Sequence, residues 1–178
     1  MDYFKKMIGR TQSPPRVSIL EIAWSWIGAF IGISAVAVVH YHFLSESDLL
    51  MIIGSFGASA VLIYGAIRSP LAQPRNLIGG HVISAVIGVG CYQLVHEPLW
   101  LASSLAVATA IAAMHATKTL HPPGGATALI AVIGSQKIHN LGYMYALFPA
   151  GFGAVLMLLV ALIVNNIPKS RRYPEFWF

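Results

Sequence analysis

The sequence predicts an all-α membrane protein that crosses the bilayer several times. Of its 178 residues, 57% are hydrophobic and only 10% are charged, whereas a soluble domain carries about 25% charged residues. Apolar runs of roughly 20 residues, the length that a helix needs to cross a bilayer, recur along the chain. The runs also fall into two halves with the same order. We therefore predict six spans, arranged as two inverted three-helix repeats with broken helices.

The predicted domain limits follow from where the apolar runs begin and end. Residues 1–17 form a basic head, 18–166 the transmembrane domain, with repeats 18–96 and 97–166, and 167–178 a basic tail. The spans run over about 19–41, 49–67, 77–95 and 99–114, then through a broken fifth stretch ending near residue 134, and finally over 143–164. Gly28 and Gly32 in the first span form a GxxxG pair, which is typical of close helix packing.

Two of the spans contain helix breaks. In the fifth, Pro122 and Pro123 remove two backbone donors, and Gly124 and Gly125 allow unusual backbone geometry. In the second, the break is the run 54–57, Gly-Ser-Phe-Gly. Non-helical backbone at membrane depth survives only where protein buries it or where it lines a wet cavity. Each break should therefore precede a half-helix, and the alternative fold has four full spans plus two re-entrant half-helices.

The two breaks are followed by similar segments. Residues 57–63 read GASAVLI and residues 125–131 read GATALIA. Inverted repeats with paired interrupted spans are the sequence signature of transporters, whose site lies near the bilayer midplane. We expect Gly57 and Gly125 to meet there, with the positive ends of both half-helices favouring an anion. A chance match between two runs of small residues is the alternative.

Charge predicts the topology. The net charge is +5, and six crossings would place nearly all Lys and Arg residues on one side, with Glu46, Asp48 and Glu97 on the other. This asymmetry predicts cytoplasmic termini and an integral protein of the bacterial inner (cytoplasmic) membrane. The basic residues flank apolar spans, so anionic lipid accounts for them and no nucleic-acid partner is expected.

The candidate substrate site combines the two breaks with polar residues near the inner surface. Its residues are Lys118, His121, Gly124, Gly125, Gly57, Ser55, Arg75, Asn76, Thr119 and His81. A lysine in a membrane segment is costly and usually functional, although Lys118 could instead be an end-of-helix lysine. His121 changes charge near neutral pH, so it could protonate a passing anion or gate with pH; alternatively, it only caps a helix. Arg75 could hold an anion or a lipid phosphate.

Enzyme chemistry is not predicted. We find no phosphate-binding glycine loop, nucleophile elbow or paired carboxylates within the spans. The seven histidines show no metal-ligand spacing inside a span, so neither a metal nor another cofactor is expected.

The run 120–126, Leu-His-Pro-Pro-Gly-Gly-Ala, resembles the signature of the HPP family of integral membrane proteins. A second block supports the resemblance: 54–62, then 69–76, closing with Gly79, Gly80 and His81. Some members in plant plastids and cyanobacteria are linked to nitrite transport. The resemblance therefore implies that a small anion such as nitrite crosses a membrane.

Together these observations predict a transporter or channel for a small inorganic anion, with nitrite as the expected substrate. A pore for a neutral small solute and a non-transporting membrane scaffold are the alternatives. The lipid bilayer is the expected environment. A homo-oligomer is also expected, because the GxxxG face and the aromatic C-terminal residues need partners.

Overall fold

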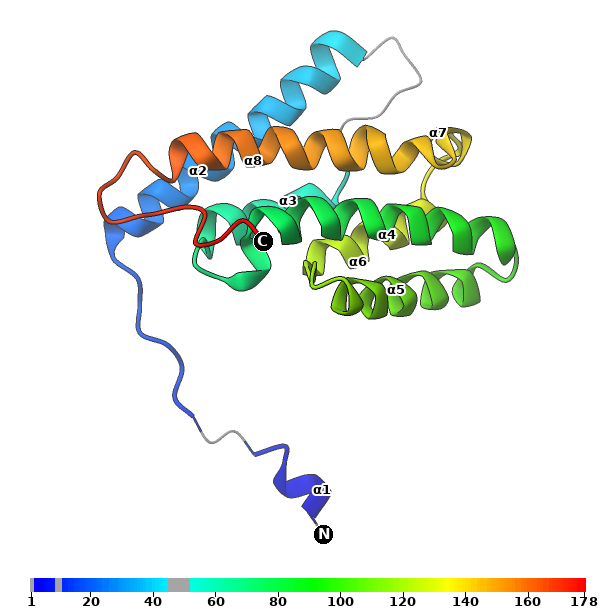
Figure 1. The fold of residues 1–178 in the computed structure, drawn as a ribbon, viewed down its shortest axis with the longest axis horizontal. Coiled ribbons are helices and arrows are strands. Elements are labelled where there is room, and N and C mark those ends of the chain that lie inside the picture. The colour runs from blue at the N-terminus through cyan, green and yellow to red at the C-terminus, as the bar shows by residue number, and fades with distance from the viewer. Residues whose placement is uncertain (1, 9–10, 45–51) are drawn as a thin grey trace.

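The computed structural model describes residues 2–8, 11–44 and 52–178, and all regular structure in this part of the chain is helical (Figure 1). The elements are α1 (Asp2–Lys5), α2 (Ile19–Val38), η1 (Val39–Leu44), α3 (Ser55–Ala60), η2 (Val61–Gly65), η3 (Pro70–Ala72), α4 (Pro74–Leu94), α5 (Leu99–Ala116), α6 (Pro122–Ile133), α7 (Gln136–Leu141), η4 (Ala146–Gly151) and α8 (Phe152–Val164).

Four helices are long and apolar enough to cross a bilayer. They cover Ile19–His42, Pro74–Leu94, Leu99–Ala116 and Ala146–Val164, which confirms four of the predicted spans. Large apolar side chains on these helices point outward: Trp26 and Leu20 of α2 are 66% and 70% exposed, and Leu159 of α8 is 52% exposed. In water such surfaces would be costly, whereas lipid tails cover them. The prediction of an integral membrane protein is therefore supported by the fold.

The second and fifth predicted spans are short helices. α6 has 12 residues, and the six residues of α3 continue directly into the five of η2. At 1.5 Å per residue, 12 residues rise about 18 Å, against about 30 Å of hydrocarbon. The six-span arrangement is therefore not confirmed, and the lengths match the alternative of four long helices with two half-helices. The predicted acidic loop 45–48 and the predicted span start at 49 lie outside the described residues.

The order long–short–long nevertheless occurs in both halves of the chain. In the first half it is α2, α3 with η2, and α4; in the second it is α5, α6 and α8. Helices α4, α5 and α6 pack against one another in one layer, while α2 and α8 form a second layer (Figure 1). The short α3 lies between the layers, where it contacts α2, α6 and α8. Each short helix thereby buries one face against longer helices.

Local sequence explains where the helices begin. Ser18 caps α2, because its hydroxyl accepts a hydrogen bond from the Glu21 N–H at 3.2 Å. Helices α4 and α6 begin at prolines, Pro74 and Pro122, whose fixed φ suits the first helical position. The last long span bends at Pro149, where Phe148 leaves helical geometry with φ −140° and ψ 122°.

Gly28 and Gly32 form a close-packing face, as predicted, but their partner belongs to the same chain. A Cβ atom on either glycine would overlap the ring of Tyr64 at the end of η2. The Tyr64 hydroxyl donates to the Met157 carbonyl of α8 at 3.0 Å, which joins the ring to a third helix. The GxxxG pair therefore does not indicate a second copy of the chain, and the homo-oligomer stays a prediction.

The C-terminal segment folds back onto the helices. The Tyr173 hydroxyl is buried, which raises its pKa, and it donates to the Ala72 carbonyl at 2.7 Å. The Glu175 N–H donates to the Gln73 side-chain oxygen at 2.9 Å. These bonds fix the C-terminal segment against the loop that precedes α4.

Candidate functional site

The two short helices meet through hydroxyl and imidazole side chains. The Thr127 hydroxyl of α6 donates to Ser55 Oγ in the first turn of α3 at 2.9 Å. One turn further along α3, Ser59 contacts His121, the residue that caps α6. Between these two contacts the residue number rises in α3 and falls in α6. The two helices therefore lie side by side and run in opposite directions. The starts of the two short helices therefore lie side by side.

Ser59 lies between two histidines. Its Oγ is 2.7 Å from His81 Nε2 and 2.9 Å from His121 Nε2. His81 Nδ1 is 2.7 Å from Thr127 Oγ1, and His121 Nδ1 is 2.8 Å from the Leu71 carbonyl oxygen. We call Ser55, Ser59, His81, His121 and Thr127 the Ser59 cluster.

The Ser59 cluster is fully buried. Each of its five side chains has 0% exposure. The ring centroids of His81 and His121 are 5.1 Å apart, and Phe56 packs edge-on against His81 at 5.3 Å. Buried polar groups are costly unless they are hydrogen-bonded, and no buried side-chain N or O atom in the described part of the chain lacks a partner. The cluster is thus a complete hydrogen-bonded chain.

Glycines let the segment before α6 approach α4 closely. A Cβ atom on Gly80 would overlap the His121 side chain, and one on Gly79 would lie 2.6 Å from Thr119 Cγ2. A Cβ atom on Gly124 would lie 2.7 Å from both the Gly80 carbonyl and Ser84 Oγ. His121 itself has extended geometry, with φ −141° and ψ 104°, as expected before a proline. The signature glycines therefore serve to place His121 beside His81.

The remaining predicted polar residues lie at the end of the molecule where Glu21 begins α2, which we call the Glu21 end. Arg75 Nε and Nη2 both donate to the Lys118 carbonyl, at 2.9 and 2.6 Å. Asn76 Nδ2 donates to the Leu120 carbonyl at 2.8 Å. Lys118 has an exposed side chain and φ 56°, which is left-handed geometry that favours glycine. Arg75 and Asn76 therefore hold the backbone that leads to His121.

A pocket of about 360 Å³ adjoins this segment. It is lined by Pro74, Arg75, Ile78, Gly79, Thr119, Trp177 and Phe178. Thr119 is 6% exposed and its hydroxyl contacts the Thr117 hydroxyl at 2.8 Å. The pocket thus lies two residues along the chain from His121, and the aromatic side chains of the C-terminal segment form one of its walls.

Gly57 and Gly125 do not meet, contrary to the prediction. Gly57 is exposed and a Cβ atom there would touch nothing within 4 Å, while one on Gly125 would contact Val107 of α5. Amide donors are also scarce at the start of α6, because Pro122 and Pro123 have no N–H and the Gly124 N–H donates to the His121 carbonyl at 2.8 Å. The contact between the short helices is made by side chains.

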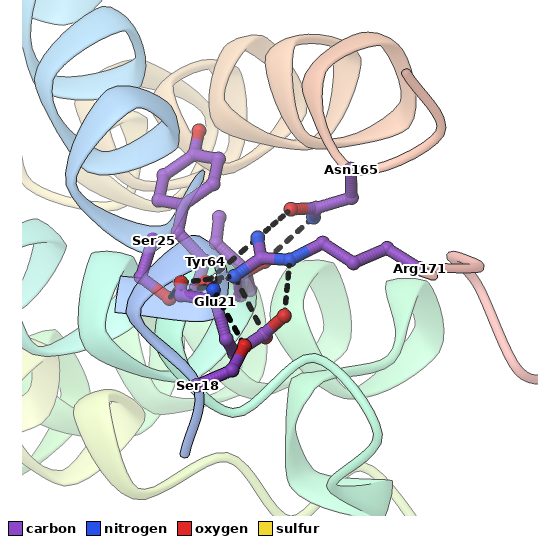
Figure 2. Close-up of polar contacts among 7 residues, drawn as sticks. Ser18, Glu21, Ser25, Tyr64, Asn165 and Arg171 are labelled. Atoms are coloured by element: carbon purple, nitrogen blue, oxygen red, sulfur yellow. Dashed lines mark hydrogen bonds and ion pairs between the residues drawn. The ribbon is translucent and has the colours of Figure 1, made fainter. Parts of the chain in front are cut away.

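Sequence reasoning missed a second buried polar group, shown in Figure 2. Arg171 donates through Nε and Nη2 to the Glu21 carboxylate at 3.0 and 2.7 Å. Its guanidinium also reaches Ser25 Oγ, Asn165 Oδ1 and the Tyr64 carbonyl, at 2.8, 3.1 and 3.2 Å. We call this group the Arg171 clamp. Its signal in the sequence was Glu21, an acid in an apolar helix, which needs a cationic partner.

The described residues contain no group of three or more His, Cys, Asp or Glu side chains that could hold a metal ion.

Comparison with known proteins is consistent with this architecture. The family model for the HPP transmembrane region matches residues 14–174. A transmembrane protein of Dictyostelium discoideum is 48% identical over 181 residues, which cover 100% of this chain and 58% of that protein. A second Dictyostelium transmembrane protein is 45% identical over 183 residues, covering 100% of this chain and 64% of that protein. The chain therefore spans less than two thirds of either relative.

No solved structure matches this chain. The two relatives are eukaryotic, so the bacterial inner membrane and the cytoplasmic termini stay predictions.

Proposed function

The chain belongs to the HPP transmembrane family, and from that premise we propose that it transports a small inorganic anion, with nitrite as the expected substrate, past the contact between its two short helices. The observation that supports this proposal best is the Ser59 cluster. Ionisable side chains inside a membrane protein are costly and usually mark a solute or ion pathway. Here two imidazoles and three hydroxyls lie together where the first turns of the two short helices meet.

The charges at the Glu21 end suit an anion. Arg75 and Lys118 flank the segment that leads to His121, and Arg75 lines the adjoining pocket. Their positive potential would raise the local concentration of an anion before it reaches the neutral cluster. The cluster then offers hydroxyl and imidazole N–H donors in place of water.

A neutral small solute is the second candidate. No Asp, Glu, Lys or Arg side chain makes a hydrogen bond to the Ser59 cluster in the described part of the chain. Hydroxyls and neutral imidazoles both donate and accept, so they suit a polar uncharged molecule as well as an anion.

Flux into proteoliposomes tests the proposal. Purified protein is reconstituted, and nitrite uptake is compared with that of protein-free liposomes and with uptake of a neutral solute such as glycerol. We expect Ser59→Ala to reduce nitrite uptake at least tenfold, because it leaves both histidine Nε2 atoms without their partner. Ser104→Ala is the matched control, because Ser104 is an exposed α5 residue whose hydroxyl bonds only to the Trp100 carbonyl.

The outcomes separate the candidates. Nitrite uptake that requires Ser59 but not Ser104 supports the anion transporter. Glycerol uptake without nitrite uptake favours the neutral pore. Uptake of neither above the protein-free level, in samples that keep their helical circular dichroism, contradicts transport and favours the scaffold.

A further inference from the structure

When the Thr127 hydroxyl points towards Ser55 and Pro123, the Ser59 cluster has one fewer proton than its hydrogen bonds require. A row of hydrogen-bonding groups runs from Leu71 O through His121, Ser59 and His81 to Thr127. Neighbouring groups are separated by four donor–acceptor distances of 2.7 to 2.9 Å, which we call gaps. Each gap needs one proton, because two lone pairs facing each other at this distance repel. A neutral imidazole supplies one N–H and a serine one O–H, so the three groups between the two ends supply three protons for four gaps.

The two ends of the row do not supply the missing proton. The Leu71 carbonyl can only accept. The single proton of the Thr127 hydroxyl faces two other acceptors, Ser55 Oγ at 2.9 Å and the Pro123 carbonyl at 3.2 Å, and while it does so it is not available to His81. With this orientation, all four gaps are filled only when one imidazole carries protons on both nitrogens.

We infer that the Ser59 cluster is a proton-binding site, in which one proton is shared between His81 and His121 through Ser59. When the proton is present, His121 donates to both Leu71 O and Ser59, Ser59 donates to His81, and His81 donates to Thr127. When the proton leaves, the four gaps close only if the Thr127 hydroxyl turns from Ser55 and Pro123 towards His81 Nδ1. The orientation of the Thr127 hydroxyl thus distinguishes the protonated from the deprotonated state of the cluster.

The surroundings of the cluster determine when the proton binds. The groups that face the two rings are neutral: Ser55, Phe56 and Ser59 of α3, Gly80 of α4, Thr127 of α6 and the Leu71 carbonyl. The cations Arg75 and Lys118 lie towards the Glu21 end, beside the segment that leads to His121, and the start of α6 also presents a positive dipole end. Burial and these positive groups oppose a lone imidazolium and favour an accompanying anion.

The proton should therefore bind together with the anion, each increasing the affinity for the other. This coupling rests on the proposed function. It predicts that one proton crosses with each nitrite ion and that the cycle moves no net charge.

Histidine ¹⁵N NMR tests the proton site without relying on transport. Protein with ¹⁵N-labelled histidine in lipid nanodiscs is titrated from pH 8 to pH 5, with and without nitrite, and His81 and His121 are assigned from His81→Gln and His121→Gln samples. We expect the paired signals of the two rings to move together towards imidazolium, at higher pH when nitrite is present. If each ring keeps one protonated and one bare nitrogen throughout, the inference is wrong, whether or not nitrite is transported.

Thr127 variants sharpen the test. Thr127→Val removes the hydroxyl with little change of shape and should abolish the joint movement of the two signals, whereas Thr127→Ser should keep it. Thr109→Val, at an exposed position of α5, controls for the substitution itself. Joint movement that persists in Thr127→Val would contradict the role given to this hydroxyl.

Proteoliposomes containing a pH-sensitive dye test the coupling. We expect a pH gradient to drive nitrite uptake above the protein-free level and a potassium diffusion potential to have no effect. Uptake that follows the potential alone would overturn the coupling. A proton-binding signal without any nitrite flux would instead leave the proton site standing and contradict the proposed function.

Discussion

The Arg171 clamp and the Ser59 cluster are both buried polar groups that join distant parts of the chain, but only the clamp contains fixed charges. Arg171 is 1% exposed and faces the Glu21 carboxylate, which is 28% exposed. The Ser59 cluster has 0% exposure and contains only hydroxyls and imidazoles. Charged pairs are costly to bury, so the clamp lies where water or lipid headgroups still reach one partner, and the neutral groups lie deeper.

We expect the two groups to differ in role, with the clamp stabilising the fold and the Ser59 cluster serving the proposed transport. In the clamp, the Arg171 guanidinium makes six hydrogen-bond contacts. This set of contacts has a single low-energy arrangement. The chain of imidazoles and hydroxyls can instead reverse its donors and acceptors without moving heavy atoms. We therefore expect substitutions in the clamp to change mainly stability and substitutions around the Ser59 cluster to change mainly flux.

The largest effect on stability is expected for Arg171→Ala. It leaves the Glu21 carboxylate, Asn165 and Ser25 without their common partner, and breaking a buried pair of this kind costs about 3 kcal/mol. Thermal unfolding in detergent measures the change. Arg172→Ala, at the exposed neighbouring position, is the control and should change stability by less than about 0.5 kcal/mol. Equal effects of the two substitutions would show that the clamp contributes nothing specific.

The second prediction compares two signature glycines. Gly80→Ala places a methyl group into the His121 side chain and should destabilise the protein by about 1–3 kcal/mol while strongly reducing nitrite uptake. Gly57→Ala meets open space and should keep both properties, with stability equal or slightly higher because alanine favours a helix. Uptake assays and unfolding curves of both variants measure this. Loss of flux in Gly57→Ala with intact folding would restore the predicted role of Gly57 in the substrate site.

The smallest effect on stability is expected at Lys118, where charge and backbone geometry can be separated. Lys118→Gly relieves the left-handed backbone and should stabilise the protein by about 1 kcal/mol. Lys118→Gln removes the same charge and keeps the strain, so its stability should be unchanged. If the charge concentrates nitrite, both variants should lower uptake by the same few-fold factor at low salt and by less at high salt. Unequal uptake would assign the effect to the backbone.

Much of the fold could be predicted because hydropathy and helix breakers act locally. The four long helices begin and end close to the expected residues, and short helices occur at both predicted breaks. The prediction of non-helical backbone was wrong at residues 55–57 and 122–125, which form the first turns of α3 and α6, because proline and glycine are tolerated at the start of a helix. The sequence grouped His121 with Lys118 and Arg75 near the inner surface, whereas His121 is fully buried beside His81 and only the other two lie at the Glu21 end. The number of membrane spans was harder to predict, because hydropathy does not show where an apolar segment leaves helical geometry.

The contacts could not be predicted because they depend on which face each helix presents. Ser59 and Ser55 are one turn apart, whereas Gly57 lies on the opposite, exposed face of the same short helix. The local match between residues 57–63 and 125–131 therefore identified the right helices but the wrong contact residues. Arg171 and Glu21 are 150 residues apart, and nothing in either local sequence indicates the other.

That separation has a consequence for biogenesis. The first hydrophobic helix must enter the bilayer with its glutamate unmatched, since the arginine that neutralises it is synthesised 150 residues later. Until then Glu21 should remain at the water interface, and the final arrangement of α2 should wait until Arg171 has been synthesised. We expect truncated nascent chains to show that helix loosely associated and open to proteases or membrane chaperones, and to become resistant only when residue 171 has left the ribosome.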